Sequence, residues 1–257
     1  MKKILQYLGL FGIMIFSFYY TNKAALIAKN SNPIMKNIND VKESLSVSSI
    51  DAVISGDYII PGLNGLEVDT TASFNKMRPY NVFNKYYMVY NQIPPKISLE
   101  DNKEKIIISG NKSKKEISII INYNNTFINY LKDNKLKYDI LTTLDTYKND
   151  NERINADKEN FKELNKLLDK DNINKHICVT NSNIDIEECK KNKYYLVKAT
   201  ELNQNNIIEI KNQVSNGSII FINDNLSITH LEVFLNYVKS KGLEIVYLSE
   251  LITETKK

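Results

Sequence analysis

The first clear pattern along the chain is an uncharged, apolar run from Ile4 to Tyr20 that directly follows Lys2 and Lys3. In helical form this run spans about 25 Å, close to the lower limit for a hydrocarbon core of about 30 Å. It fits either a signal-peptide core or a short membrane anchor. Signal-peptide cleavage requires small residues at positions −3 and −1. Ala25 and Ala28 could each supply position −1, but neither has a small residue two positions before it. We therefore expect an uncleaved anchor, and the paired lysines favour a cytoplasmic N-terminus with the remaining chain outside.

Beyond residue 112, apolar and polar positions form blocks that predict strands and helices in turn. Ile117–Tyr123 is an almost continuous apolar run, typical of a strand buried on both faces. A helix with Ser227 as its N-cap and Gly242 just past its end carries apolar residues at helical spacing. The predicted strands are Ile117–Tyr123, Tyr138–Thr143, His176–Thr180, Tyr194–Ala199, Ser218–Ile222 and Leu243–Leu248. The other predicted helices are Thr126–Asn134, Ala156–Asp169, Ile186–Lys191 and Asn206–Val214.

Strands that alternate with helices form a parallel sheet, so we expect an α/β domain over residues 113–257, open or curled into an incomplete, distorted (β/α) barrel. The preceding region, 22–112, holds all five prolines and reads as turn-rich with short strands. These short elements are strands at Ala52–Ile54, Tyr58–Ile60 and Lys105–Ser109, and a helix near Ile34–Val47. The predicted organisation is thus a membrane segment at 1–21, an extracytoplasmic region at 22–112, and the α/β domain.

One tyrosine-rich segment, Tyr86–Tyr90, allows two interpretations. Its residues alternate like those of a half-buried strand, which predicts packing in a core. Its rings could instead form a platform on which sugar rings stack.

Composition and charge narrow the range of partners. The chain has 34 Lys and Arg against 30 Asp and Glu, a formal net charge of +4. Only Arg78 and Arg153 are arginines, and the lysines are interleaved with acidic residues. Nucleic-acid binders concentrate basic residues and use arginine for bidentate contacts, so the pattern argues against nucleic acid as a partner. No glycine-rich phosphate loop follows a predicted strand, so we expect no nucleotide cofactor.

The two cysteines, Cys178 and Cys189, indicate a disulfide. Outside the membrane they can pair, closing a short loop whose stabilisation is roughly 2 to 3 kcal/mol. A zinc site would need further ligands, and the only histidines are His176 and His230. Two free buried thiols are the alternative. We interpret His176 as a strand-edge residue and His230 as a solvent-facing residue of a helix.

Candidate functional residues lie where the predicted strands end, because functional side chains of parallel α/β folds follow the carboxyl ends of the strands. All of these positions are carboxylates or amides. Such groups suit hydrogen bonding to sugar hydroxyls, and they are also common at solvated loop ends, so both interpretations stay open. The positions are Asn122, Asn124, Asp145, Asn181, Glu201, Asn223, Asp224 and Glu250, among which Asp145, Glu201 and Glu250 are the candidate binding residues.

The order of these elements resembles the polysaccharide deacetylase (NodB homology) domain. Ile117-Ser118-Ile119-Ile120-Ile121-Asn122-Tyr123 resembles the first strand of that family, and Asn134–Leu141 falls where the family has a helix end and its second strand. The most specific stretch is Gly217-Ser218-Ile219-Ile220-Phe221-Ile222-Asn223-Asp224, followed by Leu231 through Leu251, which resembles the C-terminal end of the family. The resemblance covers about residues 113–257 and implies an incomplete (β/α) barrel.

The sequence departs from the family at the positions that carry catalysis. The resemblance implies, for active members, a divalent metal held by one Asp and two His, with an Asp as base and a His as acid. Here the Asp-Asp position reads Asn122-Tyr123, or Asn124-Asn125 if shifted, and Asn223 replaces the acid histidine. An amide is a poor metal ligand and cannot act as a base. Asn122, Asn223 and Asp224 therefore occupy family positions without a catalytic role, and we expect no metal and no other cofactor; a divalent metal would be needed only if the chain is an active deacetylase.

Three functional hypotheses follow. The first is a single-pass, membrane-anchored, extracytoplasmic deacetylase-like protein that is catalytically inactive and binds cell-wall polysaccharide or an envelope protein. The alternative is an active carbohydrate hydrolase or deacetylase of the envelope, working on N-acetylated glycan. Without metal it would use a carboxylate pair among Asp145, Glu201, Asp224 and Glu250. The third is a structural or interaction protein with no affinity for sugar.

Overall fold

The computed structural model describes residues 2–148, 152–171, 176–182 and 184–256. Contacts within the chain define two compact units. The N-terminal unit comprises the residues up to Ser48 together with Gly65–Ile93. The α/β unit comprises Ser49–Asn64 and Pro94–Lys257. The boundary that the sequence suggests at residue 112 falls inside the α/β unit.

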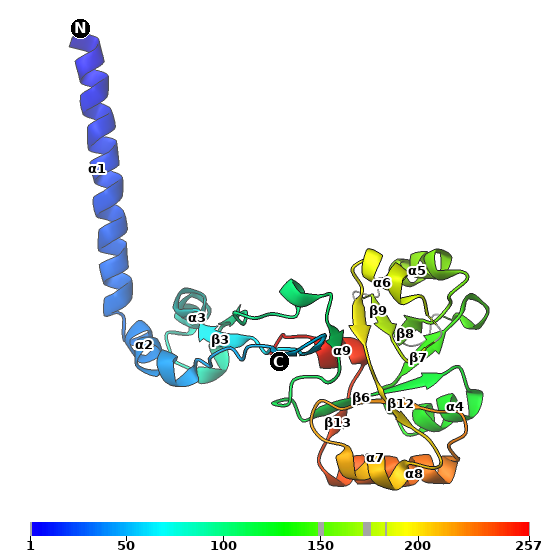
Figure 1. Cartoon of the computed structure of the whole chain (residues 1–257). Coiled ribbons are helices and arrows are strands. Elements are labelled where there is room, and N and C mark those ends of the chain that lie inside the picture. Colours follow the sequence, from blue (N-terminus) through cyan, green and yellow to red (C-terminus); the bar gives the residue numbers. More distant parts are fainter. Residues whose placement is uncertain (1, 149–151, 172–175, 183, 257) are drawn as a thin grey trace. The chain divides into compact units, whose positions relative to one another are not determined.

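The N-terminal unit begins with one long helix, α1 (Lys2–Ser31), which continues well past the predicted apolar run. Its Gly9–Ser31 stretch is long and apolar enough to cross a membrane and is not buried within the protein, although a signal sequence has the same properties. Asn32 alone separates it from α2 (Pro33–Leu45), whose first turn it caps through a 2.9 Å hydrogen bond from the Ile34 N–H to the Asn32 side chain. Figure 1 shows the chain from α1 into α2.

The rest of this unit is a small α/β cluster. Strands β3 (Gly65–Val68) and β4 (Tyr90–Ile93) pair in antiparallel fashion. Between them lie α3 (Thr70–Met77) and two short 3₁₀ turns, η1 (Arg78–Tyr80) and η2 (Lys85–Tyr87). Buried side chains from α2, β3, α3 and the segment before β4 form the core; they are Ile34, Met35, Ile38, Val68, Phe74, Met77 and Met88.

The predicted strand over Tyr86–Tyr90 is wrong for most of its length. Tyr87 ends a 3₁₀ turn, Tyr90 begins β4, and only Met88 is buried. The 3₁₀ turn forms because the Asn84 side chain accepts a hydrogen bond from the Tyr86 N–H at 2.9 Å, a local capping contact that alternation of residue types does not reveal.

The α/β unit contains the predicted parallel sheet. Its strand order is β11-β12-β6-β7-β8, with β13 paired to the start of β6, and all of these pairs are parallel. The strands are β6 (Glu116–Asn122), β7 (Asp139–Thr142), β8 (Glu152–Asn155), β11 (Thr200–Leu202), β12 (Ile219–Ile222) and β13 (Glu244–Ile245). The sequence did not predict β8 or β11; β8 precedes a shorter helix, α5 (Phe161–Lys170), than the one expected.

A second sheet, of order β1-β2-β5-β10-β9, completes the open barrel. Its strands are β1 (Val53–Ser55), β2 (Tyr58–Ile60), β5 (Ile106–Ile107), β9 (Ile177–Val179) and β10 (Tyr195–Val197). Only β1 and β2 pair in antiparallel fashion. Three of these strands come from the turn-rich region, so that region forms part of the barrel.

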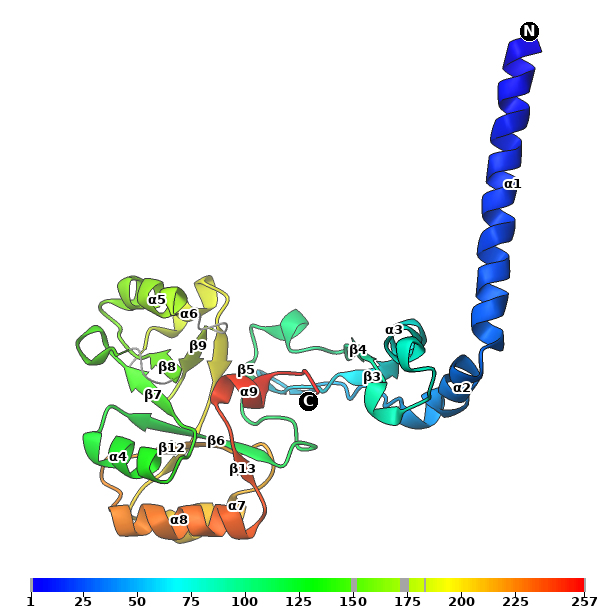
Figure 2. The same ribbon diagram turned by 180° about the vertical axis from the view of Figure 1, so that it is seen from behind.

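Helices cover the sheets in two groups. In Figures 1 and 2, α7 (Ile207–Gln213) and α8 (Ile228–Ser240) lie side by side below β6 and β12, while α5 and α6 (Ile186–Lys191) lie beside β8 and β9.

A buried cluster packs α4 (Asn125–Asp133) and α8 on the sheet. A second buried cluster contains residues of both sheets, among them Ile120, Phe221 and Val197, together with residues of α9 (Leu248–Ile252). The expected disulfide is present and joins Cys178 of β9 to Cys189 of α6. The remaining short turns are η3 (Glu100–Asn102) and η4 (Leu144–Thr146).

Candidate amide and carboxylate site at the barrel edge

The carboxyl ends of β6, β12 and β11 bring together five of the predicted polar side chains. Asn122 follows Ile120 by two positions, and Asn223 follows Phe221 by two, so both amides point to the same side as these interior residues. Because the three strands are parallel neighbours, the residues at their ends meet at one edge. We call this group the amide–carboxylate cluster; it consists of Asn122, Asn124, Glu201, Asn223 and Asp224.

Asp224 is the acceptor for two amides of this cluster. The Asn122 Nδ2 group donates to Asp224 Oδ2 at 2.8 Å, and the Asn124 Nδ2 group lies 3.4 Å from Asp224 Oδ1. The Asn124 side-chain oxygen accepts from the Thr126 N–H at 2.9 Å, where it caps α4. That cap turns the NH₂ end of Asn124 toward Asp224. Hydrogen bonds from the end of β6 and from the N-cap of α4 thus hold the Asp224 carboxylate.

Glu201 forms the second amide pair. The Asn223 Nδ2 group donates to Glu201 Oε1 at 2.7 Å, while the Asn223 side-chain oxygen accepts from the Asn225 N–H at 3.0 Å. Asn206 donates to the Glu201 carbonyl at 2.8 Å. Asn206 and Asn225 are positioning residues that the sequence reasoning missed. The asparagine-rich stretches Asn203–Asn206 and Asn223–Asn225 were the available signal, because asparagine side chains readily bond to nearby backbone in turns.

The other candidate residues do not join this cluster. Asp145 lies on η4 and is exposed. The Asn181 side chain accepts from the Ala199 N–H at 3.0 Å, a contact that links two loops. Glu250 pairs with Lys137 at 2.7 Å, and Lys137 precedes the first residue of β7, so this carboxylate lies toward the amino-terminal edge of the strands. That ion pair is the first cause of the raised pKa of Lys137.

Both histidines lie outside the cluster's hydrogen bonds. His176 Nε2 is 2.9 Å from Asp169, and its ring stacks on Tyr194 with centroids 4.4 Å apart. His230 lies in the first turn of α8, where its backbone N–H donates to Ser227 Oγ at 3.2 Å. The cluster therefore offers two carboxylates and three amides but no imidazole.

This donor set does not fit the divalent ion of an active deacetylase. Amide nitrogens that donate to Asp224 and Glu201 present N–H groups, which do not coordinate cations, and they occupy carboxylate oxygens that a metal would need. Across the described part of the chain, no three His, Cys, Asp or Glu side chains gather in a way that could hold a metal. The amides of the cluster can instead donate hydrogen bonds to a neutral polar ligand, and its carboxylates can accept hydrogen bonds from one.

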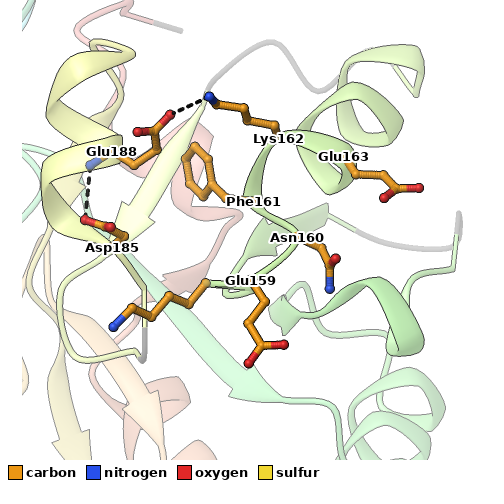
Figure 3. A pocket seen from close by; sticks show the side chains of 8 residues that line it. Glu159, Asn160, Phe161, Lys162, Glu163, Asp185 and Glu188 are labelled. Carbon is orange, nitrogen blue, oxygen red and sulfur yellow. Dashed lines mark hydrogen bonds and ion pairs between the residues drawn. The ribbon is translucent and has the colours of Figure 1, made fainter.

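A separate concavity of about 420 Å³ lies at the loops that follow β8 and β9 (Figure 3). Lys162 and Glu188 approach each other across it at 3.5 Å, and Asp185 caps α6 by accepting from the Glu188 N–H at 3.2 Å. Its polar groups are thus largely engaged in helix caps and a surface ion pair. None of the predicted site residues lines it.

The two sheets and the helices around them form the CE4 fold, which solved structures of that family share. A CE4 family pseudoenzyme from Bacillus anthracis, BA3943, superposes with a TM-score of 0.57 and 16% identity over 87% of this chain and 96% of that chain. A mutant of the same pseudoenzyme, described as having restored enzymatic activity, superposes with a TM-score of 0.56 and 15% identity, again over 87% of this chain and over 99% of that chain. These likenesses show the fold.

Sequence comparison adds one short relationship. The uncharacterized protein YlxY of Bacillus subtilis is 36% identical over 63 residues, which are 24% of this chain and 20% of that protein. The match thus spans about a fifth of the curated relative. No protein-family model matches the sequence.

Proposed function

We propose that this chain is a membrane-anchored, extracytoplasmic, deacetylase-like protein that does not deacetylate and that binds cell-wall glycan through the amide–carboxylate cluster. The observation that carries the proposal is the 2.8 Å hydrogen bond from Asn122 to Asp224 at the end of β6. An amide at this position cannot take a proton from water at neutral pH. Amides and carboxylates together match the donors and acceptors of sugar hydroxyls. An existing pseudoenzyme with the same fold is a precedent for loss of activity.

The absence of turnover is tested directly. The full chain is incubated with N-acetylglucosamine oligomers and zinc, cobalt or nickel, and released acetate is measured. We expect no acetate above background, because losing a general base costs a factor of about 10² to 10⁴ before the metal is considered. Metal-dependent acetate release that Asp224→Ala abolishes would overturn the proposal.

Glycan binding is tested by co-sedimentation with purified peptidoglycan. Asp224→Asn and Glu201→Gln should each lower retention about tenfold, the effect of losing one hydrogen bond to a charged acceptor. Asp133→Asn, which removes an exposed carboxylate on α4 outside the cluster, is the matched control and should leave retention unchanged. Wild-type protein that fails to sediment with the wall would instead favour an envelope protein as the partner.

A metal-independent hydrolase is the second candidate, favoured by the two carboxylates, Glu201 and Asp224, at one edge. Glycosidases work with two carboxyl groups about 5 to 9.5 Å apart, one of them as an acid. Appearance of new reducing ends from the same oligomers, abolished by Glu201→Gln, would support this reaction.

A further inference from the structure

The N-terminal unit carries an exposed patch of tyrosines and basic side chains, made of Lys76, Arg78, Tyr80, Val82, Lys85 and Tyr86. The Tyr86 side chain is 92% exposed and the Tyr80 side chain 64% exposed, which is unusual for aromatic residues of a folded unit. Tyr80 stacks on Tyr87 with centroids 5.3 Å apart, and the Lys76 ammonium lies 5.9 Å from the same ring. Lys76 and Tyr80 therefore both lie against the Tyr87 ring, and the other members of the patch are exposed on the same short segment of the chain.

Buried core residues and capped turns hold the segment that carries this patch in place. Phe74 before it, Met77 within its segment and Met88 after it are all buried in the core. Both 3₁₀ turns are fixed locally: Asn84 caps η2, and Asn81 ends η1 in the left-handed region at φ 50°. A rigid frame thus presents the exposed rings, which lowers the entropy cost of binding.

The charge of the patch is of one sign. Between Thr70 and Leu99 the sequence contains no Asp or Glu. The preceding carboxylate, Asp69, is engaged as the N-cap of α3, where it accepts from the Ala72 N–H at 2.8 Å. A surface with this charge favours an anionic partner.

The position of the patch in the unit indicates which anionic partner it meets. The stretch able to cross a membrane ends at Ser31, and only Asn32 separates α1 from α2. Lys29 in the last turn of α1 donates to Thr71 Oγ1 at 2.8 Å and lies 5.8 Å from the Phe74 ring. Both of those residues belong to α3, whose end leads into the patch. The patch is thus tied to the end of the helix that would leave the bilayer.

We propose that the patch contacts the headgroups of anionic lipids at the outer surface of the membrane that α1 spans. Tyrosine is enriched at membrane interfaces, where its ring lies among the headgroups, and each Lys or Arg near the surface is attracted to anionic lipid within about a Debye length of 10 Å. The N-terminal unit then rests on the bilayer and does not stand free of it. This inference rests on the membrane anchoring of the proposed function.

The chain contains no tryptophan, so one introduced tryptophan is a unique fluorescent reporter. Full-length Tyr86→Trp protein is reconstituted into vesicles of phosphatidylcholine alone or mixed with phosphatidylglycerol, each carrying a lipid quencher at headgroup depth. We expect about twofold or stronger quenching when phosphatidylglycerol is present, decreasing as salt is raised. The triple change Lys76→Gln, Arg78→Gln and Lys85→Gln should abolish that dependence on lipid charge. Lys166→Gln, an exposed lysine of α5, is the charge control and should preserve it.

Phe16→Trp, within the Gly9–Ser31 stretch of α1, reports insertion separately and should be quenched by a lipid quencher in the acyl chains in both vesicle types. Quenching of Phe16→Trp without any charge-dependent quenching of Tyr86→Trp would overturn the proposal while leaving the anchor intact. Absence of quenching at both positions would overturn the anchor itself, and the proposal with it. A Tyr86→Trp signal that responds to N-acetylglucosamine oligomers and not to lipid would assign the patch to glycan instead.

Discussion

At the scale of single residues, this chain uses carboxylates as structural acceptors. Asp224 and Glu201 accept from asparagine amides. Asp157, which is buried in the loop between β8 and α5, accepts from the backbone N–H groups of Leu144 and Asn160. Asparagine donors take the places where the family resemblance implies acids and bases. The residue identities alone therefore predict that catalysis is lost, which the acetate assay tests, while the pairing of each amide with a particular carboxylate required the fold.

Asp157 gives a prediction at this scale. Burial alone would raise the pKa of its carboxyl group, but hydrogen bonds from the Leu144 N–H at 2.9 Å and the Asn160 N–H at 2.8 Å lower the pKa overall. Because its pKa is lowered in the folded state, this carboxyl group stabilises the fold at pH values above its ordinary pKa of about 3.9. The stabilisation is lost as the pH falls through the lowered pKa. Asp157→Asn should therefore cost about 1 to 2 kcal/mol at pH 7 and progressively less below pH of about 4.

The measurement is urea unfolding of wild type and Asp157→Asn across this pH range. Asp145→Asn, an exposed carboxylate on the neighbouring η4 turn, is the control and should change the free energy of unfolding by less than about 0.5 kcal/mol. A difference between wild type and Asp157→Asn that does not vary with pH would show that the charge of Asp157 contributes nothing.

At the scale of elements, the disulfide holds α6 to β9. Cys178 and Cys189 lie 11 positions apart and are both fully buried. In the chain-entropy model, a loop of this size stabilises the folded state by about 2 to 3 kcal/mol. We expect Cys178→Ala with Cys189→Ala to lower the free energy of unfolding by that amount. Reductant should then lower the stability of the wild type and leave that of the variant unchanged; equal sensitivity of both would contradict the assignment.

Two glycines at element boundaries differ in what surrounds them. Gly242, just past α8, has φ +66° and open space around a would-be Cβ. Gly217, before β12, has φ +84°, and a would-be Cβ there would overlap the Gly110 carbonyl oxygen. Gly242→Ala should cost about 1 kcal/mol from backbone conformation alone. Gly217→Ala adds a steric clash with backbone and should cost about 3 kcal/mol. Thermal unfolding of the two variants compares them, and equal costs would exclude the close approach of Gly217 to Gly110.

At the scale of the whole molecule, the barrel depends on residues far from its main sequence block. Strands β1, β2 and β5 come from before residue 113, and β5 pairs directly with β10. A fragment of residues 113–257 would leave β10 with an unpaired edge and expose interior side chains such as Val197. We expect this fragment to aggregate or to melt without a cooperative transition. A fragment of residues 32–257, which keeps these strands and also α2 with the core of the N-terminal unit, should unfold cooperatively by circular dichroism.

Cooperative unfolding of both fragments would show that residues 113–257 form an independent domain, as the pattern along the sequence suggested.

The C-terminal tail provides a second long-range link in this unit. Glu254 Oε1 accepts from the Gly62 N–H at 2.8 Å and from the Leu99 N–H at 2.9 Å, so the end of the chain holds both early segments in place.

The sequence by itself determined the apolar N-terminal helix, the alternation of strands and helices, and the amides that stand where the family resemblance implies acidic and imidazole groups. It also favoured a disulfide between the two cysteines over free thiols. These features depend on local periodicity or on residue type, both of which are read directly along the chain. Only the tertiary structure decided that Asn122 and Asn124 share Asp224, that Glu250 lies toward the opposite edge, and that β1, β2 and β5 complete the barrel. Such contacts join residues that can be a hundred or more positions apart. Strands of two or three residues also have too little periodicity to predict which strand they pair with.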